Sequence, residues 1–491
     1  MIIPSLVILP LVVGLLLTLV GRKNPRFSEG AALLTTGLVV IFSILLIPGI
    51  NRTGSIVYEF SGWSIPYGIA FVFDHLSAFF VLIVGVLTFC AILYSLATIR
   101  KYGGTWNYYS LIMFLVAGMN NIVLTGDLFN LFVFMEITLF ASYALVAFQG
   151  RAEQFEAAFK YAIMGFISST FILIGIGSLY NLFSTLTLMH ISSLLTTTPA
   201  LNLVFALFLV GFGFKAALFP FHFWLPDVHS SAPTPVSALL SGVLVKVLGA
   251  YGLLRLFYTV FGAPRLPLEL LVVLGITTLL IGALMALPQQ DIKRMLAYSS
   301  VSSMGYILFA CGLGTPLGVL GALYHMLNHS LSKSLLFLNA GEIERAEGTR
   351  RMDLMQGKSG RFLYTTSWVG ILGISGVPPF GGFFSKLIIV LAAVQAGKTI
   401  FAVIAVAASV LTLAYYLAMM GKVFPKGPPS IVNHLRSNYP ITLSMTILVV
   451  LSLAAPLLFL PGVREITLER VVTTIFNREA YIALLTLGGS K

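Results

Sequence analysis

Apolar residues occur in long runs along the whole chain, and short polar segments separate them; residues 6–20 and 270–287 are two examples. A helix needs about 20 apolar residues to cross the hydrocarbon core of a bilayer, so each run predicts a membrane-spanning helix. The first run lacks a basic leader and a small-residue cleavage site, so we interpret it as a retained span. We predict fourteen spans, at residues 2–20, 30–49, 72–98, 107–125, 127–149, 157–183, 200–224, 233–258, 267–287, 294–314, 316–340, 363–394, 399–421 and 438–460.

The composition supports the membrane class. Of the 491 residues, 58% are hydrophobic and only 9% are charged, whereas a soluble domain carries about 25% charged residues. The longest loop covers residues 341–361, so no soluble domain is expected. Cys90 and Cys311 lie in apolar runs and form no CxxC motif, so neither a disulfide nor a metal site is predicted. The sequence therefore predicts an all-α polytopic membrane protein.

The net charge of +12 is compatible with nucleic-acid binding, but the basic residues lie in short loops rather than on one face, which indicates membrane topology instead. Under the positive-inside rule their asymmetry predicts a multi-pass protein of the cytoplasmic membrane with both termini outside. The tail at 463–491 mixes charged and apolar residues, which predicts an interfacial helix at the outer surface. Loops after even-numbered spans contain Arg52, Arg265 and Lys398. Loops after odd-numbered spans contain Arg22, Lys23, Arg26, Arg100, Lys101, Arg151, Lys293, Arg294, Arg345, Arg350, Arg351, Lys358, Arg361, Lys422, Lys426 and Arg436.

Two predicted spans are interrupted. Pro220 and Pro226 interrupt the seventh, and the segment 376–382 with its two prolines interrupts the twelfth. Proline removes a backbone donor, and broken backbone at membrane depth is tolerated only inside protein or beside a wet cavity. Breaks in corresponding places predict two five-helix repeats, spans 4–8 and 9–13. Because each repeat has an odd number of spans, the second starts on the opposite side of the membrane from the first, so the two repeats have inverted topology. The predicted parts of the chain are 1–106 (spans 1–3), 107–258 (first repeat), 267–421 (second repeat) and 422–491 (last span and outer helix).

Ionisable residues occur near the middle of several predicted spans. Such a group costs about 2.5–3.5 kcal/mol at mid-bilayer on insertion scales, so these side chains are expected to face inward, to pair or to contact water. Intramembrane ionisable residues typically mark proton or ion pathways. The residues are Glu136, Lys215, Lys246, His325, His329, Lys333 and Lys386.

His325, His329 and Lys333 are spaced by four residues, so they lie on one face of the eleventh span. Histidine titrates near neutrality and burial disfavours the charged form of lysine, so the stripe predicts a proton relay. Two alternatives stay open, namely a zinc pair formed by the histidines and a Lys333 that snorkels to the inner surface. Glu136 and Lys215 form either a proton switch or a structural ion pair.

Other ionisable residues lie nearer the span ends. Lys160 is interpreted as a snorkelling or a relay lysine, and Asp74 with His75 as a structural or access-related pair. The inner end of the seventh span carries either solvated loop residues or a cytoplasmic site of proton uptake, at His222, Asp227 and His229.

Five long motifs are jointly specific enough to indicate a family. They are GDLFNLFVFME at 126–136, KAALFPFHFWLPD at 215–227, APTPVSALL at 232–240, QDIKRMLAYSS at 290–300 and SGVPPFGGFFSK at 375–386. These motifs resemble the antiporter-like subunits of respiratory complex I and of the Mrp cation/proton antiporters, over nearly the whole chain. Within that family the chain is most similar to the Mrp D subunits and to their homologues in archaeal membrane-bound hydrogenases and sulfur reductases.

The resemblance implies roles for the buried residues. Glu136 matches the essential glutamate of the fifth span, and Lys215 matches its lysine partner. Lys246 matches the lysine that links the two halves. The histidine pair of the eleventh span matches the central path, and Lys386 matches the terminal lysine that leads to the other side.

The resemblance implies an antiporter-like subunit of a multisubunit respiratory complex, which translocates protons, or cations and protons, along this midplane row. It implies other membrane subunits as partners, including small antiporter subunits and hydrogenase-like or iron–sulfur subunits, besides the lipid bilayer. We expect no catalytic redox site, cofactor, metal or nucleic acid in this chain. Two alternatives remain: the D subunit of a stand-alone Mrp Na+/H+ antiporter, and a transport-inactive scaffold. The presence of every relay position in the sequence argues against the scaffold.

Overall fold

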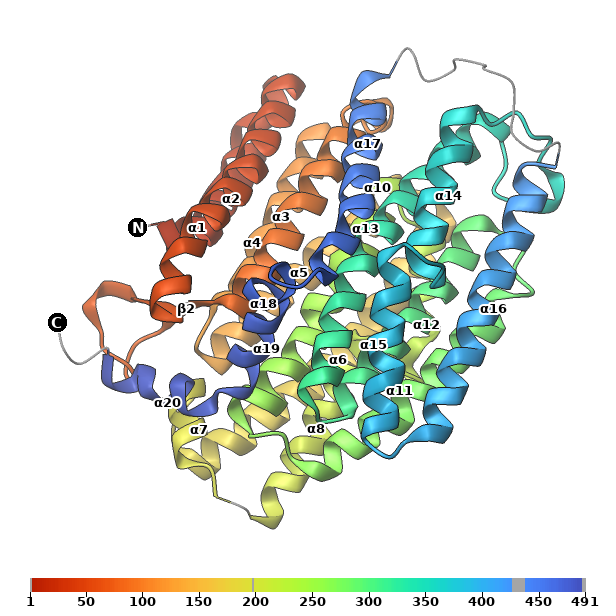
Figure 1. The fold of residues 1–491 in the computed structure, drawn as a ribbon. Coiled ribbons are helices and arrows are strands. Elements are labelled where there is room, and N and C mark those ends of the chain that lie inside the picture. The colour runs from red at the N-terminus through yellow and green to blue at the C-terminus, as the bar shows by residue number, and fades with distance from the viewer. Residues whose placement is uncertain (1, 197, 426–437, 488–491) are drawn as a thin grey trace.

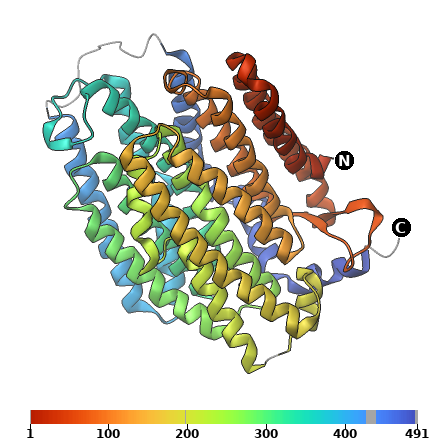
Figure 2. The ribbon, with the colours of Figure 1, turned by 180° about the vertical axis from the view of Figure 1, so that it is seen from behind.

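The computed structural model describes residues 2–196, 198–425 and 438–487. Within these residues the chain forms a bundle of long helices, which Figures 1 and 2 show from opposite sides. Two of the predicted basic loop residues, Lys426 and Arg436, lie outside the described residues. The helices and strands are α1 (Ile2–Val20), α2 (Pro25–Thr53), β1 (Ser55–Glu59), β2 (Ala70–Asp74), α3 (His75–Ser95), α4 (Thr105–Leu124), α5 (Leu128–Val146), α6 (Ala152–Phe183), α7 (Leu188–Leu194), α8 (Pro199–Lys215), α9 (Trp224–Ser231), α10 (Thr234–Leu239), α11 (Arg265–Ala286), α12 (Ile292–Gly312), α13 (Pro316–Glu347), α14 (Arg361–Ser375), α15 (Gly381–Gln395), α16 (Thr399–Val423), α17 (Tyr439–Ala454), α18 (Val463–Ile466), α19 (Leu468–Phe476) and α20 (Arg478–Leu487).

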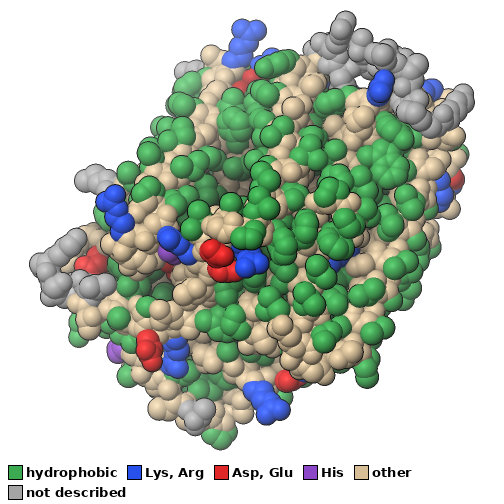
Figure 3. Space-filling view, viewed as in Figure 1, with side chains coloured by type: hydrophobic (Ala, Val, Ile, Leu, Met, Phe, Trp, Pro, Cys, Tyr) green, Lys and Arg blue, Asp and Glu red, His purple; other side chains and the backbone are tan. Residues whose placement is uncertain are grey.

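Each predicted span has a helical counterpart. Eleven helical segments of the described chain are long and apolar enough to cross a membrane. The other three predicted spans correspond to the α8–α9 pair, to the polar helix α13 and to the α14–α15 pair. In Figure 3 apolar side chains cover much of the visible surface. The all-α polytopic membrane fold is therefore confirmed, while the inverted relation of the two repeats stays a prediction.

Both predicted helix breaks are present. Helix α8 ends at Lys215, and the chain passes through Ala217, at φ +54°, before α9 begins. Helix α14 ends just before Gly376, at φ +87°, and α15 begins at Gly381. Two constraints favour glycine at position 376. Its φ is positive, and a Cβ atom there would lie 3.1 Å from the side chain of Lys386. Each break thus lies beside a buried lysine.

The eighth span departs from a regular α-helix, which the sequence did not predict. After α10, π-helical hydrogen bonding occupies Leu240–Leu244 (η5), Lys246–Tyr251 (η6) and Leu254–Val260 (η7). Such turns are rare and occur frequently at functional sites. Gly249 allows η6 to approach the break after α8, since a Cβ atom there would lie 2.6 Å from the Ala216 Cβ. The distorted span therefore packs directly against the first break.

The two ends of the bundle differ in the charge of their loops. The loops that follow α1, α3, α5, α11 and α13 lie at one end, at the top of Figure 1. We call this end the basic face, because these loops carry most of the basic residues of the odd-numbered connections. The opposite face carries α7, the C-terminal helices and an antiparallel β1–β2 hairpin, which the sequence did not predict.

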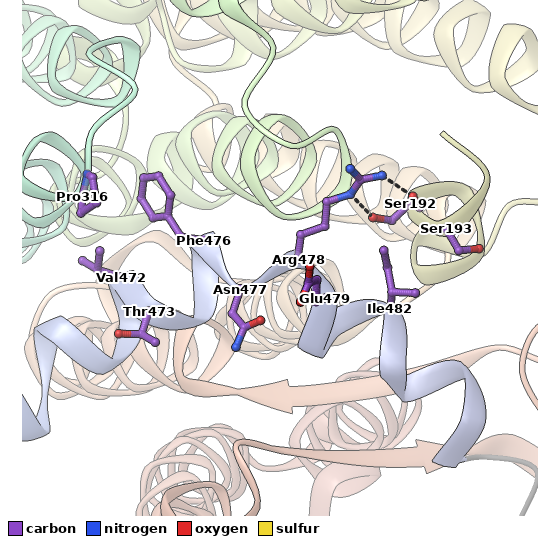
Figure 4. A pocket seen from close by; sticks show the side chains of 10 residues that line it. All are labelled: Ser192, Ser193, Pro316, Val472, Thr473, Phe476, Asn477, Arg478, Glu479 and Ile482. Atoms are coloured by element: carbon purple, nitrogen blue, oxygen red, sulfur yellow. Dashed lines mark hydrogen bonds between the residues drawn. The ribbon is translucent and has the colours of Figure 1, made fainter. Parts of the chain in front are cut away.

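The C-terminal tail folds as three short helices rather than one. Helix α19 buries Leu468, Val471 and Ile475 where it packs against α3, α13 and η7. Arg478 donates from its Nε to Ser192 Oγ at 2.9 Å and from its guanidinium to the Ser192 carbonyl, beside an open groove between α7 and α20 (Figure 4). The described part of the tail therefore lies at the face opposite the basic face, and the apolar side of α19 covers protein.

Candidate functional site

Glu136 and Lys215 are linked through a third side chain. The Lys215 Nζ, at the end of α8, donates to Ser169 Oγ of α6 at 3.0 Å, and that hydroxyl donates to Glu136 Oε1 of α5. Lys215 is buried and Glu136 is half-buried. In the described residues the two form no direct ion pair within 4.0 Å, so the expected direct pair is corrected to a serine-bridged one. Ser169 was not predicted from the sequence, although a serine pair in the middle of an apolar span was a signal.

A small cavity adjoins the Lys215 side chain. Its volume is about 10 Å³, and Tyr161 and Trp224 help to line it. These two rings stack with centroids 4.5 Å apart. A cavity of about this size holds one water molecule when polar partners are available. The site therefore has room for one water beside the lysine.

Lys246 is held by backbone carbonyls of its own span. Its Nζ donates to the carbonyls of Ser241 at 2.7 Å and Gly242 at 2.6 Å. A regular α-helix commits these carbonyls to its own amides, and the π-helical turns η5 and η6 disturb that pattern. Two neutral acceptors thus hold a fully buried lysine side chain, in a span whose hydrogen bonding departs from the α-helical pattern.

The two histidines lie together in the second half. Their ring centroids are 6.5 Å apart, and both side chains are fully buried. His325 Nδ1 is 3.0 Å from Ser385 Oγ, whereas His325 Nε2 and both ring nitrogens of His329 have no hydrogen-bond partner in the described chain. Buried polar groups normally have a partner, often water. Among the described residues no third His, Cys, Asp or Glu side chain joins this pair in a group that could hold a metal ion.

Lys386 lies beside the second break. Its Nζ donates to the carbonyl of Ser375, the last residue of α14, at 3.3 Å. It also lies 4.9 Å from the centroid of the Tyr306 ring, and that ring lies 5.3 Å from His325. Lys386, Tyr306 and the histidines therefore form one continuous cluster. Ser385 and Tyr306 were not predicted.

Lys333 is fully buried and does not snorkel. Its Nζ donates to the Leu296 carbonyl at 2.9 Å, to Ser299 Oγ at 2.7 Å and to the Tyr416 hydroxyl at 2.9 Å. The Tyr415 hydroxyl also donates to Ser299 Oγ, at 2.8 Å. The snorkelling alternative is therefore wrong, because the ammonium is surrounded by acceptors from α12 and α16.

The residues around the first break have different environments. Asp227 forms ion pairs with Lys160 at 3.0 Å and with Arg294 at 2.7 Å, so it links α6, α9 and α12. Lys160 belongs to that surface network, which favours neither of its two predicted roles. His222 is half-buried at the break, and His229 is fully buried with both ring nitrogens unpartnered within the described residues. The three predicted uptake residues therefore do not form one cluster of contacts.

Asp74 has a buried partner that the sequence did not indicate. Arg255 donates from both terminal nitrogens to the Asp74 carboxylate, at 2.7 and 3.0 Å. Both side chains are 2% exposed. Arg255 also donates to the Tyr251 hydroxyl at 3.1 Å. This geometry supports the structural interpretation of Asp74, while His75 contacts Thr474 of α19.

The comparison with known proteins now adds to this geometry. Residues 125–412 match the family described as NADH:quinone oxidoreductase/Mrp antiporter, TM. The chain belongs to this family. It is 36% identical over 439 residues to the N subunit of the NADH-quinone oxidoreductase of Desulforudis audaxviator, with 86% of each sequence covered. It is 33% identical over 413 residues to the D subunit of the Na(+)/H(+) antiporter of Alkalihalophilus pseudofirmus, with 83% of each covered.

Two solved structures are similar over the whole chain. A subunit of the membrane-bound sulfane sulfur reductase, an archaeal respiratory membrane complex, has a TM-score of 0.90 at 28% identity, covering 98% of this chain and 99% of its own. A subunit of the Mrp complex from Dietzia has a TM-score of 0.88 at 26% identity, covering 98% of both. The resemblance noted from the motifs is confirmed at the level of the family.

Proposed function

We propose that this family member translocates protons across the cytoplasmic membrane as one subunit of a multisubunit complex. The observation that supports this function is the set of ionisable side chains in the interior, and in the proposal they form a row that runs from Glu136 through Lys215, Lys246 and the two histidines to Lys386. On insertion scales the free-energy cost of placing all these groups in the membrane is on the order of tens of kcal/mol. A transport role explains why the chain carries them.

The contacts suggest how a proton moves along the row. Ser169 accepts a hydrogen bond from Lys215 and donates one to Glu136. Its hydroxyl therefore connects the amino group of the lysine to the carboxyl group of the glutamate. A negative Glu136 favours the charged form of the lysine, and its neutralisation favours release of the lysine proton. Lys246 and Lys386 are held by carbonyls, which are neutral acceptors. Water at the unpartnered histidine nitrogens completes the connection between them.

The orientation follows from the charges of the loops. The basic face is the cytoplasmic face under the positive-inside rule, which places both termini outside. In this proposal protons enter at one face, move along the row, and leave at the other face from the end of the row at Lys386.

The similar proteins support two kinds of parent complex. One relative is named as a subunit of an NADH-quinone oxidoreductase and another as a subunit of a Na(+)/H(+) antiporter. The preferred candidate is a redox-driven respiratory complex, and the second is a stand-alone Mrp antiporter. Mass spectrometry of the purified complex distinguishes them, because iron–sulfur or hydrogenase-like subunits belong only to the first. The genes beside this one provide the same distinction.

The decisive test of transport uses Lys215→Ala and Glu136→Ala in the assembled complex. We expect either change to abolish ion-coupled proton movement in vesicles, because each removes one end of the serine-bridged pair. Blue-native electrophoresis checks that the complex still assembles. Undiminished transport in assembled variants would refute the assignment.

A further inference from the structure

A charged cavity opens at the basic face, away from the row. Its volume is about 310 Å³, and it lies between the end of α3, the start of α10 and the last turns of α13. We call it the vestibule. Its charged lining residues are Lys101, Arg151, Lys293, Glu342, Glu344, Arg345 and Arg350. None of them belongs to the predicted site.

Glu342 is the most buried acid of the vestibule, with 3% of its surface exposed. Its Oε1 accepts from the Tyr94 hydroxyl at 2.8 Å, and its Oε2 lies 2.6 Å from the Arg345 guanidinium. Burial favours the protonated form of a carboxyl group, whereas a neighbouring cation favours the charged form. Both effects act on Glu342, through its burial and through Arg345.

The other charges of the vestibule are largely neutralised by partners. Lys293 pairs with Glu344 at 2.7 Å, and Arg350 pairs with Glu153 at 3.0 Å and with Asp291 at 3.1 Å. Besides its two contacts, Glu342 therefore faces the Lys293–Glu344 pair, the nearby Lys101 and the remaining cations of the lining.

A line of hydroxyl groups leads from the vestibule towards Lys246. Thr234 lines the vestibule at the start of α10, and Ser237 follows one turn later. The Ser334 hydroxyl of α13 donates to the carbonyl of Ala238 at 3.2 Å. Ser241 then contacts Ser300 through their hydroxyls at 2.7 Å, and its carbonyl is an acceptor of Lys246. Each turn between the vestibule and the lysine thus carries a polar group.

Unpartnered polar atoms indicate water along this line. His229 is fully buried, and its carbonyl accepts from Ser237 Oγ at 2.8 Å. Both of its ring nitrogens, and Ser330 Oγ of α13, have no partner among the described residues. A buried polar atom without a protein partner is generally satisfied by ordered water.

We propose that Glu342 collects protons at the basic face and supplies them to Lys246 through this hydrated line. A proton from vestibule water binds the Glu342 carboxylate and passes to water beside the serine hydroxyls. It is then taken up by the neutral Lys246 amine, and Glu342 returns to its charged form. Asp227 suits this task less well, because two cations hold its carboxylate. The inference rests on the proposed function.

The test measures proton uptake from the basic face by the whole complex in inverted vesicles, at pH 6 and pH 8. Glu342→Gln cannot carry a proton, so we expect uptake at least tenfold slower than wild type at pH 8. At pH 6 direct protonation from water should recover most of the rate. Glu342→Asp keeps the carboxyl group and should recover uptake at both pH values. Glu347→Gln, on the same helix outside the vestibule, is the matched control and should behave as wild type.

The outcomes separate this inference from the proposed function. A Glu342→Gln complex with wild-type uptake at pH 8 overturns the inference, and so does a complex that is equally slow at both pH values. Lys215→Ala, measured in parallel, should be inactive at both. If that variant also transports normally, the proposed function itself is wrong, whatever Glu342 does.

Discussion

Replacement of Ser169 by alanine tests the bridge between Glu136 and Lys215. The hydroxyl accepts from the lysine at 3.0 Å and donates to the glutamate. Alanine removes both hydrogen bonds and leaves the backbone of α6 unchanged. Lys215 then loses the acceptor that connects it to Glu136, and because the residue is only 4% exposed, the small cavity beside it offers room for no more than one replacement water.

The size of the effect follows from the kind of bond. A hydrogen bond to a charged group contributes about 1.5–3 kcal/mol, and each 1.4 kcal/mol changes a rate tenfold. If transfer across the bridge limits transport, loss of one such bond slows it about ten- to a hundredfold. Ser169→Thr retains the hydroxyl and should preserve a large part of the rate.

The assay follows acidification of vesicles that contain the assembled complex. Ser168→Ala is the matched control, because the neighbouring hydroxyl is equally buried and donates to the Gly211 carbonyl at 2.8 Å. It removes one hydrogen bond between α6 and α8 but not the bridge. Equal rates in Ser169→Ala and wild type, or an equal loss in both alanine variants, would refute the reasoning.

Two further predictions concern the scaffold around the row. Asp74→Asn leaves the Arg255 charge buried without its ion partner, so we expect about 3–5 kcal/mol of destabilisation and a clearly lower Tm in detergent. The control is Asp353→Asn, in an exposed pair with Arg351, which should change Tm little. Equal Tm values for the two variants would contradict the structural role of Asp74. Gly376→Ala should cost about 1–2 kcal/mol through its positive φ and also slow transport by displacing Lys386, whereas Gly397→Ala, at φ +72° with open space around it, should cost similar stability and leave transport intact.

The fold was largely predictable, because membrane insertion imposes a simple rule on the sequence. Apolar runs predicted the eleven helical segments of the described chain that are long and apolar enough to cross a membrane, and prolines predicted both breaks. The π-helical turns of the eighth span were not predicted, because no feature of the apolar pattern in this segment distinguishes a π-helical from an α-helical span. The β1–β2 hairpin was missed because β1 lies in a segment interpreted as a connection, and residues 72–74 of β2 were predicted to be the start of the third span.

The site was predictable where charge alone marks it. A lysine or glutamate in an apolar run is conspicuous, so the residues proposed for the ends and centre of the row could be selected from the sequence, and the structure places Lys215, Lys246 and Lys386 in the interior. Ser169, Ser385 and Tyr306 were missed, because hydroxyl groups are common in membrane helices and their importance depends on which neighbour they meet. Arg255 was missed although it is charged, since it lies near a predicted span end, where basic residues are usual.

The acceptors around the lysines differ in a way that bears on the mechanism. Lys246, Lys333 and Lys386 are held in the described structure by carbonyls and hydroxyls. These acceptors stay neutral whether the lysine is protonated or not. Lys215 alone among these four is connected to an acid, through Ser169. A change in the position or protonation of Glu136 therefore alters the proton affinity of Lys215 directly, and that of the other lysines only through their neighbours. Because Glu136 is also half-buried on α5, we expect under the proposed function that a driving force from another subunit acts first at this residue.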